Sequence, residues 1–114
     1  MKSKIADRVR IQHILDAIKE IQSYTAGVSF EDFRQNSMMR FASIKQLEII
    51  GEAANNITDE TKNKFPLISW NEIIGLRNIL IHEYFGVDDN ILWDIIRNDI
   101  PLLKKQLSEI IDQI

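Results

Sequence analysis

The sequence predicts an all-α protein, folded as an up-and-down antiparallel bundle of four to five helices. Glycine and proline are scarce, with four and two among 114 residues. The alternating pattern of a half-buried strand is absent, and long stretches instead place apolar residues three and four positions apart. Short connections between successive long helices favour antiparallel neighbours. We therefore expect one helical domain over residues 1–114.

The first helix is predicted over about residues 5–23. Its apolar side chains recur at helical spacing and so share one face. This stripe consists of Ile11, Ile14, Leu15, Ile18 and Ile21. Thr25-Ala26-Gly27 ends the helix, because glycine accepts the left-handed backbone that is common after a helix C-terminus. Ser29 then predicts the N-cap of a short helix at about residues 30–34.

A second long helix is predicted over about residues 37–56. Its apolar stripe consists of Phe41, Ile44, Leu47, Ile50 and Ala54. Asn55-Asn56 marks its end. The helix that follows, at 58–64, can only be short, because Pro66 disfavours helical geometry at Phe65.

A third long helix is predicted to start at Ser69. Glu72 follows three residues later, and this spacing is the pattern of a capping box. The helix is expected to run to about Tyr84, where Gly86 stops it. It contains the most chemically loaded stretch of the chain, the octapeptide RNILIHEY at 77–84.

A last amphipathic helix is predicted over about residues 91–114. Asp88 or Asp89 is expected to cap it, because a carboxylate can accept hydrogen bonds from the free N–H groups of a first turn. Pro101 has no N–H group to donate, so we expect the helix to kink or restart there.

The composition indicates a globular protein without a membrane segment. The chain is 45% hydrophobic and 27% charged, and no apolar run approaches the roughly 18 residues of a membrane span. The N-terminus lacks the apolar segment of a signal peptide before Asp7 and Arg8 intervene. No cysteine is present, which excludes disulfides, thiolate metal sites and cysteine nucleophiles. We expect a cytoplasmic protein.

The charge argues against binding of nucleic acid through a broad basic surface. The net charge is -3 and the pI is about 5.3, so any RNA contact must be local. Some basic residues could cluster in the fold, although scattered solubilising charge is the favoured interpretation. These residues are Lys4, Arg8, Arg10, Arg34, Arg40 and Lys45.

Arg77 occupies a costly position on the third long helix. On a helical wheel at about 100° per residue, the apolar residues of this helix cover an arc about 180° wide. Arg77 stands near the middle of the arc, and Tyr84 lies about 20° from it. An arginine among buried residues is costly unless a carboxylate pairs with it, or unless that face meets a partner and a ligand.

Asn78 and His82 are four residues apart on one edge of this arc, next to Arg77. The three residue types suit cleavage of a phosphodiester. His82 can exchange protons near neutral pH, Arg77 can stabilise the charge of a phosphorane, and Asn78 can orient the histidine or a phosphate oxygen. No metal is needed if the 2′-OH of RNA is the nucleophile. By residue type alone, however, a structural role for a lone arginine and a lone histidine is the more frequent one.

The same stretch resembles the signature of the HEPN superfamily, with Arg77, a polar residue at Asn78, and His82 five residues after the arginine. It continues to Tyr84, two residues past the histidine, as in the HepT-like branch. The resemblance covers nearly the whole chain. Further similar segments are residues 7–15, 50–54, 65–70 and 86–88, then Trp93 and residues 99–101.

The resemblance implies a HEPN-like bundle and a toxin ribonuclease of a prokaryotic toxin–antitoxin pair. Members of this family are homodimers whose motif helices face each other across one cleft, and they cleave RNA without a metal ion or other cofactor. Arg77 and His82 would be catalytic, with Asn78 and Tyr84 supporting. The implied partner is a minimal nucleotidyltransferase (MntA-like) antitoxin, in a larger hetero-oligomer with the homodimer. It uses ATP to attach AMP to the motif tyrosine, here Tyr84.

Two alternatives to an RNA endonuclease stay open. One is a non-catalytic HEPN module that binds nucleotide or a protein partner, and the other is a purely structural helical dimer. The intact pair of Arg77 and His82 favours the enzyme, because a scaffold gains nothing from a buried arginine. The wide apolar arc independently favours a homodimer.

Metal chemistry is disfavoured by the histidines. His82-Glu83 is half of a His-Glu-x-x-His zinc motif, but Gly86 stands where the second histidine would be. His13 is the only other histidine, and we expect it to be a surface or otherwise satisfied polar residue.

Several other residues are predicted to serve the fold. Glu52 lies among small residues, and structural pairing with a basic residue in the core or dimer face is favoured over a catalytic assist. Trp70 and Trp93 are expected in core or hinge packing. A set of bulky residues is expected in the core or an interface rather than in base stacking. These are Met38, Met39 and Phe41.

Overall fold

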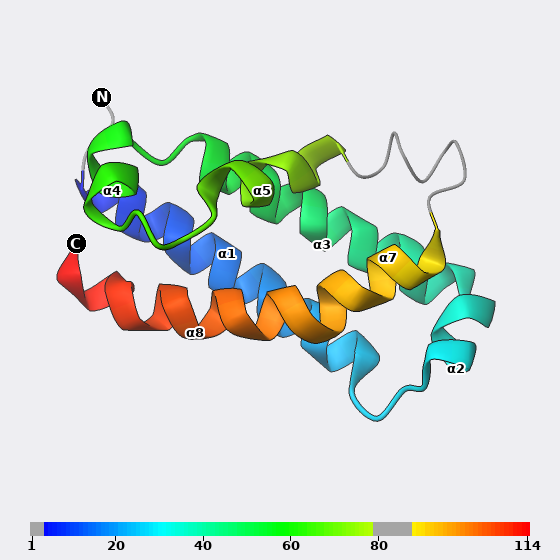
Figure 1. Ribbon diagram of the computed structural model, residues 1–114. Coiled ribbons are helices and arrows are strands. Elements are labelled where there is room, and N and C mark those ends of the chain that lie inside the picture. Colours follow the sequence, from blue (N-terminus) through cyan, green and yellow to red (C-terminus); the bar gives the residue numbers. More distant parts are fainter. Residues whose placement is uncertain (1–3, 79–87) are drawn as a thin grey trace.

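The computed structural model describes residues 4–78 and 88–114 (Figure 1). None of these residues lies in a β-strand, so the predicted all-α class is confirmed. The α-helices are α1 (Lys4–Thr25), α2 (Phe30–Gln35), α3 (Ser37–Asn55), α4 (Asp59–Lys64), α5 (Trp70–Gly75), α7 (Asp89–Asp94) and α8 (Ile100–Ile110). Shorter elements are the 3₁₀ turns η1 (Leu76–Asn78) and η3 (Ile111–Gln113) and the π-helical turn η2 (Ile95–Asp99).

The helices run up and down along the molecule (Figure 1). α1 leads away from the end that holds the C-terminus, α3 returns, α5 and η1 lead outward again, and α7 to α8 return. α1 packs against α3 and α8, while α3 packs against α5 and η1. The predicted antiparallel bundle is therefore confirmed. No helix in the described part of the chain is long and apolar enough to cross a membrane.

Isoleucine and leucine side chains form most of the core. The predicted stripes are buried at Ile11, Ile14, Ile18 and Ile21 of α1 and at Ile44, Leu47, Ile50 and Ala54 of α3. α8 closes the core with Ile100, Leu103 and Leu107. Since burying one such side chain contributes about 1.5–3 kcal/mol relative to leaving it exposed, these stripes supply the main stabilising term.

The prediction of Phe41 in the buried stripe is wrong, because Phe41 is 52% exposed. On a wheel at about 100° per residue, it lies roughly 120° from the centre of the buried face of α3. Met38 is 78% and Ile49 39% exposed, and both lie on the same outer side. Met38 and Phe41 were expected in the core or in an interface. Their exposure excludes the core of the single chain and leaves the interface as the prediction.

Two predicted caps are confirmed. Ser29 accepts a hydrogen bond from the Asp32 backbone N–H at 3.1 Å at the start of α2. Asp88 accepts one from the Asn90 N–H at 2.8 Å at the start of α7. Gly27 has a φ of 71°, the left-handed conformation expected after α1.

The predicted capping box at Ser69 is wrong. Ser69 is the residue before α5, but its side chain accepts no capping hydrogen bond. Its ψ is 67°, whereas the true cap at Ser29 has a ψ of 161°. The tight turn instead directs the Trp70 N–H to the Ile68 carbonyl oxygen at 2.9 Å. Backbone geometry after Pro66 has thus replaced the side-chain cap.

Near Pro101, where we expected a kink or a restart, the helix continues but changes from π to α geometry. α8 begins at Ile100 with Pro101 in its first turn. Just before it, the Ile100 N–H donates to the Ile95 carbonyl, five residues back, which defines the π turn η2. The wider turn accommodates the missing proline donor, and such turns often occur at functional positions.

Candidate functional site

Arg77 lies in η1, directly against the backbone of α3. Gly51 makes this approach possible, since a Cβ atom at Gly51 would lie 2.3 Å from the Arg77 nitrogen. No side chain larger than hydrogen fits there, so Gly51 fixes the height at which η1 crosses α3. The sequence shows Gly51 among small residues, but does not show which segment it admits.

Glu52, the next residue on α3, is the acidic neighbour of Arg77. Glu52 Oε2 lies 3.8 Å from Arg77 Nη1, and the side chains are 62% and 38% exposed. At this distance the contact is an ion pair without a hydrogen bond. Exposed pairs of this kind contribute at most about 1 kcal/mol. Arg77 can therefore exchange this carboxylate for another anion at little cost.

The predicted burial around Arg77 is wrong for the single chain. The wheel assumed α-helical geometry through the motif, but α5 ends at Gly75 and a 3₁₀ turn follows. A 3₁₀ turn advances about 120° per residue instead of about 100°. Ile73 is buried and Leu76 half-buried, whereas Arg77 and Asn78 are exposed. The guanidinium is thus presented at the surface.

The other motif residues, His82 and Tyr84, lie outside the described residues, as does Glu83. The structure therefore brings together Arg77 and Glu52, with Asn78 next in the same 3₁₀ turn. The predicted place of His82 next to Arg77 on one helix stays a prediction.

The chain after the motif is tied back to α3. Arg40 Nε lies 3.6 Å from Asp89 Oδ1, and both side chains are largely shielded from solvent. The Arg40 guanidinium also donates to the Arg34 carbonyl oxygen. Arg40 and Gly51 are about 16 Å apart along α3, at about 1.5 Å per residue. α3 thus holds both ends of the segment that contains His82 and Tyr84, a role for Arg40 that the sequence did not reveal.

Two of the other basic side chains that the sequence singled out form local ion pairs. Arg8 pairs with Asp112 at 3.3 Å, and Arg34 pairs with Glu31 at 2.5 Å. The hydrogen bond from Arg34 lowers the pKa of the Glu31 carboxyl, and Glu31 correspondingly raises the pKa of Arg34. The favoured interpretation of scattered charge agrees with these local pairs.

Aromatic packing agrees with the structural roles expected for the tryptophans. Trp70 is 7% exposed, and its Nε1 donates to the Phe65 carbonyl oxygen at 3.0 Å. The Trp93 ring lies 4.8 Å from that of Phe33, and the Arg97 guanidinium stacks over it at 4.3 Å. His13 is on the surface of α1. Within the described ranges, no three histidine, aspartate or glutamate residues are grouped to hold a metal ion.

Comparison with known proteins assigns the chain to a protein family. The family described as ribonuclease HepT-like matches residues 14–110 of the chain. The chain belongs to the HepT-like ribonuclease family. This membership confirms both the resemblance that the motif indicated and the enzyme class, a ribonuclease.

Two relatives of this HepT-like chain match it over most of their own length. One from Methanocaldococcus jannaschii, named "Putative RNase MJ1380", is 44% identical over 95 residues, which is 83% of this chain and 87% of that protein. Another from Thermococcus cleftensis, named "Probable ribonuclease HepT", is 42% identical over 100 residues, 88% of this chain and 91% of that protein. No solved structure matches the chain significantly.

Proposed function

We propose that this HepT-like protein is a metal-independent RNA endonuclease that uses Arg77 to bind the scissile phosphate and His82 to transfer protons. The observation that carries the proposal is the presentation of Arg77. Its guanidinium is partly exposed and forms a weak, solvated ion pair with Glu52. A planar guanidinium can bind two phosphate oxygens at once, which a stably buried pair would prevent.

The reaction needs no other nucleophile than the RNA itself. The 2′-oxygen attacks the adjacent phosphorus as a base removes its proton, and the bond from phosphorus to the 5′-oxygen breaks. The leaving oxygen takes up a proton, so the products are a 2′,3′-cyclic phosphate and a 5′-hydroxyl. His82 acts as base or acid, Asn78 orients it or the phosphate, and Arg77 stabilises the added negative charge.

Glu52 fits a supporting role in this mechanism. In the free protein it holds the Arg77 guanidinium near α3 without hydrogen-bonding to it. When RNA binds, the phosphate replaces this carboxylate. Glu52 would then position Arg77 and limit anion binding in the empty site, without touching the reacting atoms.

A homodimer would complete the site, and α3 offers a surface for it. Three apolar side chains, Met38, Phe41 and Ile49, are 78%, 52% and 39% exposed along its outer face. At about 100° per residue, Glu52 falls within the same arc. A second copy packed on this outer face of α3 would thus bring its own Arg77 near the first. Burial of exposed apolar area supplies the driving force.

The same proposal includes a toxin role and control by adenylylation in the cytoplasm. A minimal nucleotidyltransferase antitoxin would transfer AMP from ATP to the Tyr84 oxygen and release pyrophosphate. The added phosphate would compete with RNA for Arg77. Support comes from family membership and from the short sequence distance between Arg77 and Tyr84.

The decisive test measures cleavage of a short fluorescent RNA by the purified protein in EDTA. We expect activity in the wild type and its loss in Arg77→Ala and His82→Ala, with unchanged helical circular dichroism. Arg77→Lys should also fail, because a point charge cannot replace a planar fork. Activity in any of these variants would refute the assigned roles. A wild type that binds RNA without cutting it would favour the alternative of a non-catalytic binding module.

A further inference from the structure

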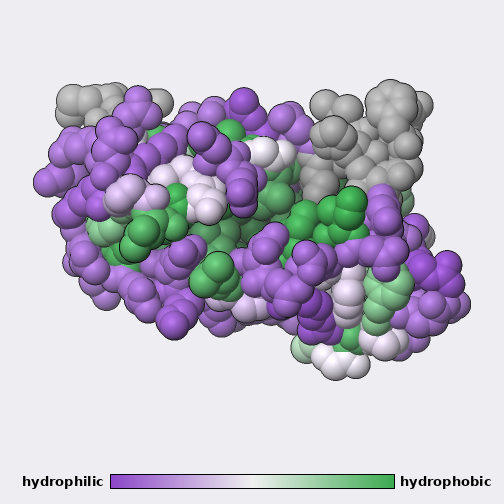
Figure 2. All heavy atoms as spheres, in the orientation of Figure 1, coloured by the Kyte–Doolittle hydropathy of each residue, from purple (hydrophilic) through white to green (hydrophobic). Residues whose placement is uncertain are grey.

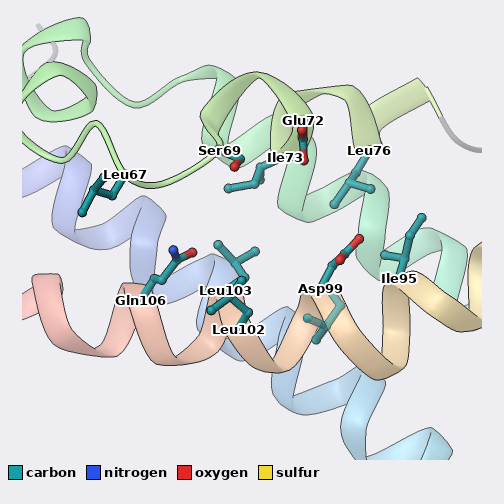
Figure 3. A pocket seen from close by; sticks show the side chains of 11 residues that line it. Leu67, Ser69, Glu72, Ile73, Leu76, Ile95, Asp99, Leu102, Leu103 and Gln106 are labelled. Carbon is teal, nitrogen blue, oxygen red and sulfur yellow. The ribbon is translucent and has the colours of Figure 1, made fainter.

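A groove runs between α5 and the η2–α8 segment, and neither Arg77 nor Glu52 lines it. It encloses a cavity of about 200 Å³. Ile73 and Leu76 line one wall, and Ile95 and Leu103 line the other. Figure 3 shows these side chains directed toward the space between the two ribbons. The groove is therefore apolar at its base.

The mouth of the groove is also apolar, although it faces water. Leu67 is 90% and Leu102 56% exposed, and both contribute to the lining. Figure 2 shows hydrophobic surface gathered in the hollow between α5 and α8. Large exposed leucines beside an apolar cavity are typical of a surface that another molecule covers.

Two carboxylates accompany these apolar residues. Glu72 comes from α5 and Asp99 from η2, and in Figure 3 the Asp99 carboxylate points toward Leu76. Neither forms an ion pair with any residue in the described part of the chain. Burial, together with the charges of Asp94 and Glu72, raises the pKa of Asp99. Among the described residues, the two carboxylates of the groove therefore have no paired cation.

We propose that this groove docks a segment of a partner protein that combines leucine-like side chains with a flanking lysine or arginine. The apolar side chains would cover Ile73, Leu76 and Leu103. The cation would lie between Glu72 and Asp99. RNA does not fit this surface, because its phosphates would meet carboxylates.

A second copy of the chain is a poorer occupant. A two-fold axis through the groove would place Glu72 and Asp99 of one copy near the same residues of the other. Like charges at close range oppose such an interface. On the outer face of α3, Glu52 shares its arc with Lys45, so charges of both signs accompany the apolar stripe there. The groove and the outer face of α3 therefore suit different occupants.

The test uses a synthetic, fluorescein-labelled helical peptide with leucines on one face and lysines beside them. Two matched peptides replace the lysines with glutamates or the leucines with serines. Anisotropy titration with the full chain should show binding of the leucine–lysine peptide alone. The Glu72→Gln/Asp99→Asn variant should weaken binding about tenfold, in the range measured for interfacial charge pairs. Glu20→Gln/Glu60→Gln, which removes two exposed carboxylates elsewhere, should not.

A charge swap makes the assignment specific. The Glu72→Lys/Asp99→Lys variant should prefer the glutamate peptide. Equal binding of both charged peptides, no binding by the wild type, or no effect of the groove variants would overturn the proposal. A lower sedimentation mass in the groove variants would do so too, since a second copy would then be the occupant. RNA cleavage, measured on the same samples, should be unchanged, so a failure here is distinguishable from a failure of the proposed function.

Discussion

Gly51 and Arg77 are 26 positions apart in the sequence, but their backbones are in contact. A Cβ atom added at Gly51 would lie 2.3 Å from the Arg77 nitrogen. We predict that Gly51→Ala displaces η1, lowers the free energy of unfolding by about 1–3 kcal/mol and reduces RNA cleavage. Urea denaturation and initial cleavage rates measure these effects. The control is Gly75→Ala, where nothing lies within 4 Å of the added Cβ. Equal results for the two alanine variants would contradict the role of this contact.

Glu52→Gln should separate positioning from catalysis. Removing the carboxylate next to Arg77 eliminates a competitor for RNA phosphate, so we expect KM to fall while kcat changes little. The decrease should not exceed about fivefold, because an exposed ion pair contributes at most about 1 kcal/mol. Glu48→Gln, one turn earlier on α3, is the control for net charge. A tenfold loss in kcat at unchanged KM would instead place Glu52 in the chemistry.

Asp7 should make stability depend on pH. This buried carboxylate on α1 accepts hydrogen bonds from the Thr58 N–H at 3.0 Å and from the Thr58 and Thr61 hydroxyls at 2.6 Å. Burial alone would raise the pKa of Asp7, but these hydrogen bonds outweigh it and lower the pKa below 3.8. The stabilisation is therefore complete above the unfolded pKa of about 3.9 and disappears as the pH falls through the lower folded value.

The Asp7→Asn variant tests this dependence. We expect it to lose about 2 kcal/mol at pH 7, since hydrogen bonds to a charged group contribute about 1.5–3 kcal/mol. Its stability should also vary less than that of the wild type between pH 5 and about pH 2. Urea titrations across this range give both values. Asp16→Asn, on the exposed side of α1, should match the wild type; a similar loss in both variants would remove the special role of Asp7.

Phe41→Glu and Met38→Glu should disrupt the proposed homodimer. Both side chains are exposed on the outer face of α3, so a glutamate there leaves the single chain folded but is costly once buried against a second copy. Sedimentation at micromolar concentration should change from the mass of two chains to that of one. Leu67→Glu, at the mouth of the groove, serves as control. A wild type that sediments as one chain, or a dimer lost only in Leu67→Glu, would refute this interface.

Tyr84→Phe should abolish adenylylation without abolishing cleavage. Incubation of the wild type with its partner nucleotidyltransferase and ATP should add AMP units to the intact mass and inhibit RNA cleavage. The added phosphate brings negative charge to the place where Arg77 must meet RNA. If the phenylalanine variant still gains AMP, or if the modified wild type still cuts RNA, Tyr84 is not the switch.

The local chemistry of the sequence determined the two long helices α1 and α3 and several helix ends. Apolar spacing gave the buried stripes of α1 and α3, and Ser29, Gly27 and Asp88 marked ends that depend on neighbouring residues only. The motif around Arg77 and Asn78 could also be identified from the sequence, because its residues are close together along the chain. Family membership then confirmed the ribonuclease class that the motif indicated.

Tertiary structure alone decided what surrounds these elements. Contacts such as Gly51 with Arg77, Arg40 with Asp89 and Asp7 with Thr58 join residues that are far apart in sequence. Each depends on the depth and rotation at which two helices pack, which periodicity does not specify. The change from α to 3₁₀ geometry at Leu76 was likewise not specified by the apolar periodicity of the sequence. Arg77 lies at the surface and not at its predicted place among buried residues, because η1 leaves the α-helical path and packs its backbone against α3.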